Sequence, residues 1–310
     1  MKKVYLLILM SLIMTACEKE IDFTGGYPED KLYIYGFLEA DSCISVQYGK
    51  TNKPNSWNDK KLDNASISIM VNGKEVLSKE VVNSDILKTD IKVQGNDIVE
   101  VKLKVSGFET ASGSVKINDK AYKPYSYKLE YKADTTDANN ITERLYLSMS
   151  LKGLPTEETF FRVMPYMEGK FGNDNHYSTL ECNSFKLVSE NITGVFSSSL
   201  NNPSNSSNNK YMFFSNKLFG NNEYRMKAII YEHTFSLDYD EPQLKKVNAK
   251  IVFSNIDKDY YLFLQSLQRS DQISSSFSPN YVYSNIENGY GVVTSAKNTS
   301  EYIVLDIENK

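Results

Sequence analysis

Histidine, cysteine and tryptophan are scarce in this sequence. Of its 310 residues, two are histidine (His176 and His233), three are cysteine and one is tryptophan. The two histidines are far apart and have no His-x-x-x-His or paired-cysteine spacing, so a zinc site is not expected. A Gly-x-Ser-x-Gly nucleophile elbow and a glycine-rich phosphate loop are missing too. These absences predict a protein that is not an enzyme and holds no cofactor.

Long apolar runs and an excess of positive charge are also missing. No segment approaches the 18 or more consecutive apolar residues of a membrane-spanning helix. The formal net charge is −4, and the lysines and arginines form no basic stripe. Because nucleic-acid binding depends on clustered positive charge, we expect no nucleic-acid partner.

The first seventeen residues have the pattern of a bacterial lipoprotein signal. Lys2 and Lys3 precede an apolar run from Val4 to Met14, which has the length of a signal-peptide core. The segment Ile13-Met14-Thr15-Ala16-Cys17 resembles a lipobox, in which Cys17 becomes the lipidated N-terminus. An ordinary secretory signal with a cysteine there by chance is the alternative. We expect a signal peptide over 1–16 and a lipidated tether over 17–30 that attaches the protein to a membrane.

Acidic residues follow Cys17 closely. Glu18, Glu20 and Asp22 resemble the signal that directs lipoproteins of Bacteroidota-type bacteria to the outer face of the outer membrane. A charged, solvated tether would explain the same residues without an export signal. We expect outer-membrane attachment with exposure at the cell surface, and a periplasm-facing protein is the alternative.

Composition and alternation indicate a mainly β protein. The chain holds 22 tyrosines and 15 phenylalanines, and serine and asparagine separate its short apolar segments. The run from Ala65 to Val71 alternates apolar and polar residues and ends at Asn72-Gly73, a pair that favours a type I′ hairpin turn. Short strands at intervals of roughly 8–12 residues predict an immunoglobulin-like β-sandwich over 31–118.

A second β-rich domain is expected over 119–310, as a sandwich or a barrel-like sheet. One segment in it departs from the β pattern. Asp257 can cap a helix, and apolar residues recur at helical spacing up to Arg269, which predicts a short helix near 257–269. After Cys17, only Cys43 and Cys182 remain. We expect two thiols, because a disulfide between them would have to join the two predicted domains; such a disulfide is the alternative.

The candidate ligand-binding residues are aromatic. Aromatic rings can cover the apolar faces of a sugar or peptide, while the polar tips of tyrosine and tryptophan form hydrogen bonds. The candidates are Trp57, Tyr166, Phe171, Tyr177 and Tyr283. In a tyrosine-rich β protein, packing in the core is the alternative role of each ring.

An acidic cluster is the remaining candidate for a metal-binding or catalytic site. Asp238, Asp240 and Glu241 stand just before Pro242. Such carboxylates could bind calcium or form the acid pair of a glycoside hydrolase. Their spacing does not match a calcium loop, and a solvated turn explains them as well, so no metal is expected.

Two motifs resemble a known group of lipoproteins. One is Leu32-Tyr33-Ile34-Tyr35-Gly36-Phe37-Leu38, and the other is Ser284-Asn285-Ile286-Glu287-Asn288-Gly289-Tyr290-Gly291. With the lipobox, they resemble a large family of Bacteroidota outer-membrane lipoproteins of unknown function. Members commonly have Leu and Phe where this chain has Tyr290 and Val293. The resemblance implies an accessory role beside TonB-dependent outer-membrane transporters, by analogy only.

The second motif is also expected to be a structural turn. Asn288 and Gly289 tolerate a positive φ, and Gly291 permits a close approach of another backbone. A binding loop is the alternative.

These observations predict a non-enzymatic lipoprotein that is an accessory or ligand-capturing component of a TonB-dependent transporter. Its ligand would be a glycan or a peptide. A structural or adhesive cell-surface protein is the second hypothesis. An enzyme acting on glycans or peptides is the third.

Overall fold

The computed structural model describes residues 30–51, 61–137, 139–172, 176–182, 186–187, 211–218, 223–236, 243–272 and 282–307. Within these ranges the chain is mainly β, with one α-helix, α2 (Lys258–Gln272), and one short 3-10 helix, η1 (Asn216–Leu218), which agrees with the predicted fold class. The predicted signal peptide, Cys17, Trp57 and the cluster of Asp238, Asp240 and Glu241 lie outside the described residues.

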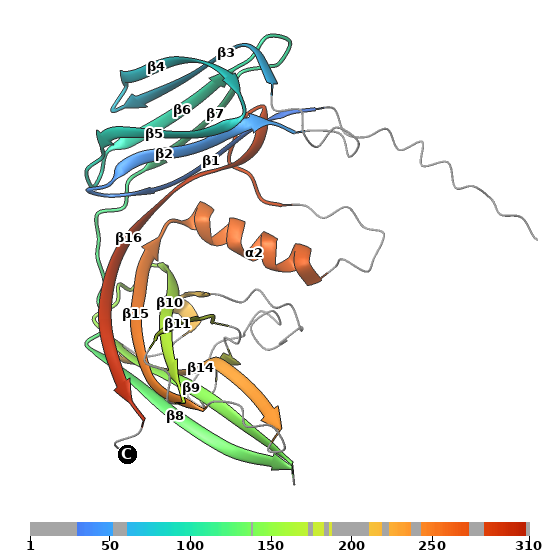
Figure 1. Ribbon diagram of the computed structural model, residues 1–310. Helices are drawn as coiled ribbons and strands as arrows, with labels where there is room; N and C mark the ends of the chain where they lie inside the picture. The colour runs from blue at the N-terminus through green and yellow to red at the C-terminus, as the bar shows by residue number, and fades with distance from the viewer. Residues whose placement is uncertain are drawn as a thin grey trace, which may run out of the picture.

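The described strands form three sheets (Figure 1). The long sheet has the order β11 (Ser178–Leu180), β10 (Phe160–Phe171), β15 (Leu244–Ile256), β16 (Gly289–Asp306), β1 (Leu32–Glu39), β2 (Cys43–Lys50) and β5 (Asp85–Lys92), and β13 (Met212–Ser215) also pairs with β10. The second sheet has the order β12 (Lys186–Leu187), β14 (Glu223–Ser236), β9 (Asn140–Lys152) and β8 (Ser126–Asp137). The third has the order β4 (Lys74–Asn83), β3 (Lys61–Val71), β6 (Ile98–Lys104) and β7 (Ala111–Lys116).

Two lobes result, because different parts of the long sheet face the other two sheets. In the N-terminal lobe, β1, β2 and β5 share a core with the third sheet. In the C-terminal lobe, β10 and β15 share a core with the second sheet. The alternation of strand side chains produces both cores; on β6, for example, Val99, Val101 and Leu103 are fully buried. The predicted hairpin turn between β3 and β4 is confirmed, since Asn72 and Gly73 have φ values of 54° and 78°.

Strand β16 belongs to both lobes. Residues 289–296 pair in parallel with β1, and residues 296–306 pair antiparallel with β15. Val293 accordingly lies in the core of the N-terminal lobe, while Leu305 lies in that of the C-terminal lobe. Figure 1 shows β16 as one long strand passing from one lobe to the other. The domain boundary at 118/119 stays a prediction; the pairing adds that residues from the end of the chain complete the sheet that begins at residue 32.

The Ser284–Gly291 motif forms the turn that leads into β16. Asn288 has a φ of 55° and Gly291 a φ of 107°, whereas Gly289 is not among the residues with positive φ. A Cβ atom on Gly291 would overlap the carbonyl oxygen of Ile34 on β1 and lie 2.8 Å from its carbonyl carbon. The predicted close backbone approach at Gly291 is therefore confirmed.

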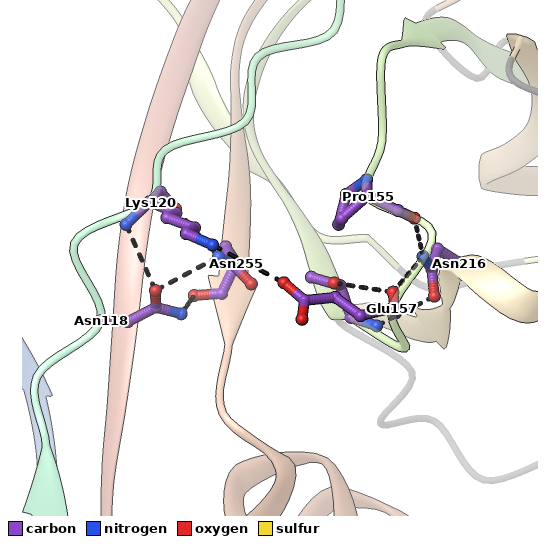
Figure 2. Close-up of polar contacts among 7 residues, drawn as sticks. Asn118, Lys120, Pro155, Glu157, Asn216 and Asn255 are labelled. Carbon is purple, nitrogen blue, oxygen red and sulfur yellow. Dashed lines mark hydrogen bonds and ion pairs between the residues drawn. The ribbon is translucent and has the colours of Figure 1, made fainter.

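The segment 117–125, which connects β7 to β8 and so links the two lobes, is fixed to the long sheet (Figure 2). The side-chain amides of Asn118 and Asn255 donate to each other's oxygens: Asn118 Nδ2 to the Asn255 carbonyl at 3.2 Å, and Asn255 Nδ2 to Asn118 Oδ1 at 3.3 Å. Asn255 Nδ2 also donates to the Lys120 carbonyl oxygen at 2.9 Å, and Lys120 forms an ion pair with Glu157. Because Asn255 is buried on β15, this network holds the connection in one place.

Helix α2 packs on the outer face of the long sheet where the lobes meet. Its residues Tyr260, Phe263 and Leu264 are buried against Ile256 of β15 and Val292 of β16. The predicted helix near 257–269 is thus confirmed, and it extends to Gln272. Figure 1 shows α2 beside β15 and β16, above the C-terminal lobe.

Candidate functional site

A pocket of about 780 Å³ lies against strands β10, β15 and β16 of the C-terminal lobe. This volume is within the range of about 300–1,000 Å³ that is typical of small-molecule sites. The lining residues are Met164, Pro165, Tyr166, Met167, Glu168, Thr179, Leu180, Glu181, Cys182, Asn248, Ala249, Lys250, Tyr302, Ile303 and Val304. None of them belongs to the second sheet, so the pocket lies on the outer face of the long sheet rather than in the core.

A row of three side chains crosses the floor of the pocket. Tyr166, Lys250 and Tyr302 are in register on β10, β15 and β16. The adjoining residues Met167 and Ala249 are buried, and the alternation of strand side chains therefore directs the row outward. Tyr166 is 53% exposed and Tyr302 is 72% exposed. The two tyrosines stand two strand spacings apart, about 10 Å between their Cα atoms.

A second, more polar row lies beside the first. Glu168, Asn248 and Val304 are in register on the same three strands, and Thr179 of β11 stands opposite Glu168. These side chains offer a carboxylate, an amide and a hydroxyl group, which together can donate and accept hydrogen bonds. The pocket therefore combines exposed aromatic rings with a few convergent polar groups.

Lys250 and Glu168 bring two opposite charges to the pocket. Lys250 Nζ lies 5.5 Å from the centroid of the Tyr302 ring, in a cation–π contact. Within the described ranges, neither Lys250 nor Glu168 forms an ion pair or a side-chain hydrogen bond. They are diagonal neighbours on adjacent antiparallel strands, with Cα atoms about 7–8 Å apart, so their long side chains could reach each other.

The predicted aromatic candidates have different surroundings. Tyr166 lines the pocket, and Tyr177 is 40% exposed just before β11. Phe171 is half-buried and packs against the core of the C-terminal lobe. Tyr283 donates a 2.6 Å hydrogen bond to Asp259 Oδ1, which connects the segment before β16 to α2. Tyr302 was not predicted, because a strand residue in a continuous apolar segment has no local signal of exposure.

The residues that often carry chemistry have structural partners. The His233 ring stacks with those of Tyr231 and Phe235, and Cys43 and Cys182 are not joined by a disulfide. In the part of the chain that the structure describes, no three His, Cys, Asp or Glu side chains gather as a metal site would require.

Glu143 is a buried carboxylate in the C-terminal core. It accepts hydrogen bonds from the Tyr131 hydroxyl at 2.6 Å and from the backbone N–H of Leu244 at 3.3 Å. Burial, together with this contact to Glu143, raises the pKa of Tyr131. The arrangement connects β8 and β9 of the second sheet to β15 of the long sheet, which is a structural role.

Asp257 connects α2 to β16. Its Oδ1 accepts a hydrogen bond of 2.7 Å from the backbone N–H of Tyr260, as an N-cap does, and its Oδ2 accepts one from the backbone N–H of Ser295. Burial raises the pKa of Asp257 from 3.8 to about 6, although both hydrogen bonds act in the opposite direction.

Replacing Asp257 with alanine is expected to lower the free energy of unfolding by about 2–4 kcal/mol at pH 5, because a cap is lost and the buried Ser295 N–H loses its acceptor. The folded-state pKa is the higher one, so protonation stabilises the fold fully below about pH 4, and this contribution disappears as the pH rises through about 6. The difference between wild type and Asp257→Ala should therefore shrink by up to about 3 kcal/mol between pH 4 and pH 7. Urea unfolding at a series of pH values measures it.

Lys258→Ala is the matched control, since Lys258 is the exposed neighbour of Asp257 at the start of α2. It should change stability by less than about 0.5 kcal/mol at every pH. A difference for Asp257→Ala that stays constant or grows with pH would contradict the assignment.

Comparison with known proteins identifies a family and weak structural likenesses. The described part of the chain contains no helix that is both long and apolar enough to span a membrane. No curated protein matches the chain. The apo structure of Bacteroides uniformis beta-glucuronidase 3 is similar at 10% identity with a TM-score of 0.22, over 72% of this chain and 23% of that one. This chain thus spans less than a quarter of the glucuronidase, and a score so low carries no argument about fold or activity.

The family match covers nearly all of the chain. Residues 18–302 match the family described as "Domain of unknown function (DUF4249)". This range includes the two motifs, Leu32–Leu38 and Ser284–Gly291, and all of the residues that line the pocket except Ile303 and Val304. The chain belongs to the DUF4249 family.

Proposed function

We propose that this protein is a non-enzymatic, lipid-anchored protein of the outer membrane that captures a small ligand beside a TonB-dependent transporter. The lipobox at Cys17 supports the anchor, and the acids Glu18, Glu20 and Asp22 support a place at the cell surface. The transporter partner rests on the resemblance of the two sequence motifs to envelope lipoproteins.

The pocket carries the ligand-capturing part of the proposal. Tyr166 and Tyr302 present large rings to solvent on a sheet whose opposite face is a packed core. Exposed aromatic rings are costly to leave in water and are enriched where proteins bind ligands. A purely structural or adhesive protein would not need Lys250 between those rings and Glu168 in the next row, neither of which has an ionic partner among the described residues.

Replacing Cys17 with serine tests the anchor and the partner together. A multiply acylated cysteine holds a protein stably, because each buried methylene contributes about 0.8 kcal/mol. Most of the Cys17→Ser protein should therefore be found in the soluble fraction, whereas wild type stays with the outer membrane. Cross-linking and affinity purification of wild type from native outer membranes should recover a transporter barrel, identified by mass spectrometry.

The matched control is Cys43→Ser, which removes an exposed thiol of β2 and leaves the lipobox intact. It should fractionate as wild type does. Recovery of no barrel with the correctly anchored protein would overturn the transporter role, and recovery of fimbrial or matrix proteins would favour the adhesive hypothesis. Cleavage of an oligosaccharide or peptide by the purified protein would favour the enzyme hypothesis.

A further inference from the structure

The pocket also indicates the chemical class of its ligand. We propose that it binds a short peptide with free ends, whose α-ammonium group contacts Glu168 and whose α-carboxylate contacts Lys250. This inference rests on the proposed ligand-capturing function and names what is captured.

The opposite charges of Lys250 and Glu168 are the first feature that favours a peptide ligand. Lys250 and Glu168 are close enough to pair, yet Lys250 lies over the Tyr302 ring, and neither has an ionic partner among the described residues. A ligand that carries both signs of charge compensates both side chains at once, through charge-assisted hydrogen bonds. A neutral glycan would leave two uncompensated charges beside it in the bound state. Charge complementarity therefore favours a peptide over a neutral glycan.

The aromatic rings on either side of Lys250 are the second feature that favours a peptide ligand. Tyr166 and Tyr302 are its direct cross-strand neighbours, so a ligand anchored at Lys250 lies between two aromatic surfaces. Met164 and Val304 add apolar surface at the edges of the pocket. Aliphatic or aromatic side chains of a peptide would pack on these groups.

A short edge of β10 that no described strand covers is the third feature that favours a peptide ligand. β13 pairs with residues 160–163 of β10, and β11 pairs with residues 167–169. No described strand pairs with Met164, Pro165 or Tyr166 on that side, and all three line the pocket. This short edge leaves backbone groups available to a peptide main chain, as in strand addition. Pro165 has no N–H, and the gap is only three residues long, so a long strand cannot add here.

Peptide binding can be tested with the full lipidated chain in detergent. The probe is a pool of random-sequence tetrapeptides with free ends, compared with the same pool N-acetylated, the same pool C-amidated, and the neutral tetrasaccharides maltotetraose and cellotetraose. Equilibrium dialysis followed by mass spectrometry measures how much of each is retained. The free-ended pool should be retained, and blocking either end should weaken retention about tenfold or more.

Two variants assign each charge to one end of the peptide. With Glu168→Gln, N-acetylation should no longer weaken peptide retention, whereas C-amidation should still weaken it. With Lys250→Met, C-amidation should no longer weaken retention, whereas N-acetylation should still weaken it. Tyr166→Ala with Tyr302→Ala should weaken retention of every peptide pool. The matched controls are Lys88→Met and Glu80→Gln, two exposed residues of the N-terminal lobe, which should leave retention unchanged.

The possible results separate this inference from the proposed function. Retention of the tetrasaccharides but no peptide would overturn the inference, and ligand capture would stand. Equal retention of free and blocked peptides would overturn it as well, because the charges would then play no part. Retention of free-ended peptides by a protein that recovers no transporter barrel would support the inference and overturn only the transporter role.

Discussion

Gly291→Ala is expected to destabilise the chain by at least about 4 kcal/mol, a large part of the roughly 5–15 kcal/mol that stabilises a typical domain. The new Cβ would overlap the carbonyl oxygen of Ile34, a backbone atom in the middle of β1 that cannot move without breaking the β1–β16 pairing. The φ of 107° at this position adds strain of about 1–3 kcal/mol for any L-residue. Urea unfolding followed by circular dichroism, or the yield of folded protein if none unfolds cooperatively, measures the effect.

Substitutions of two other glycines separate the effect of the steric clash with Ile34 from the effect of backbone strain. Gly107 has a φ of 83° but open space where its Cβ would lie, so Gly107→Ala should cost only about 1–2 kcal/mol. Gly36 lies on β1 opposite Val293, with no positive φ and its nearest neighbours at 3.7 Å, so Gly36→Ala should change stability by less than about 1 kcal/mol. If Gly291→Ala lowered the stability no more than Gly107→Ala does, the result would contradict the close approach of Gly291 to Ile34.

A fragment of residues 30–124 is expected not to fold by itself, although it contains every strand of the N-terminal lobe except β16. Without residues 284–296, β1 loses its parallel partner, and the core loses the buried side chains of Val293 and Ile286. Those two side chains alone correspond to about 3–6 kcal/mol of burial, against a total stability of about 5–15 kcal/mol for a typical domain. Circular dichroism and urea unfolding of the purified fragment test this expectation.

Restoring the missing strand is the control for that experiment. Residues 284–299 joined to the fragment through a flexible glycine–serine linker should recover cooperative unfolding. The same construction with Gly291→Ala should not recover it, because the strand could no longer approach Ile34. Cooperative unfolding of the fragment alone would show that β16 is dispensable for the N-terminal lobe.

Local features of the fold could be predicted where neighbouring residues decide the conformation. Asn72-Gly73 forms the expected turn because both residues accept a positive φ. Asp257 caps α2 because its carboxylate reaches the N–H group of Tyr260, three residues further on. Gly291 allows the expected close approach because it has no Cβ. Each of these outcomes depends on interactions within a few residues or on the size of one side chain.

The candidate site could be predicted only in part. Tyr166 was a candidate from its residue type, but Lys250, Glu168 and Tyr302 have no distinguishing local pattern. They become a site because β10, β15 and β16, which are separated by long stretches of sequence, pair in one register. A shift of that register by one residue would turn Tyr302 into the core and Ile303 outward.

The sequence by itself determined the class of the protein: a mainly β chain with one short helix, a hairpin at Asn72-Gly73 and a helix cap at Asp257. Only the tertiary structure decided that β16 joins both lobes and that the pocket forms on the outer face of the long sheet. The physical reason is that turns and caps arise from nearby residues, whereas strand pairing depends on which distant apolar faces bury each other.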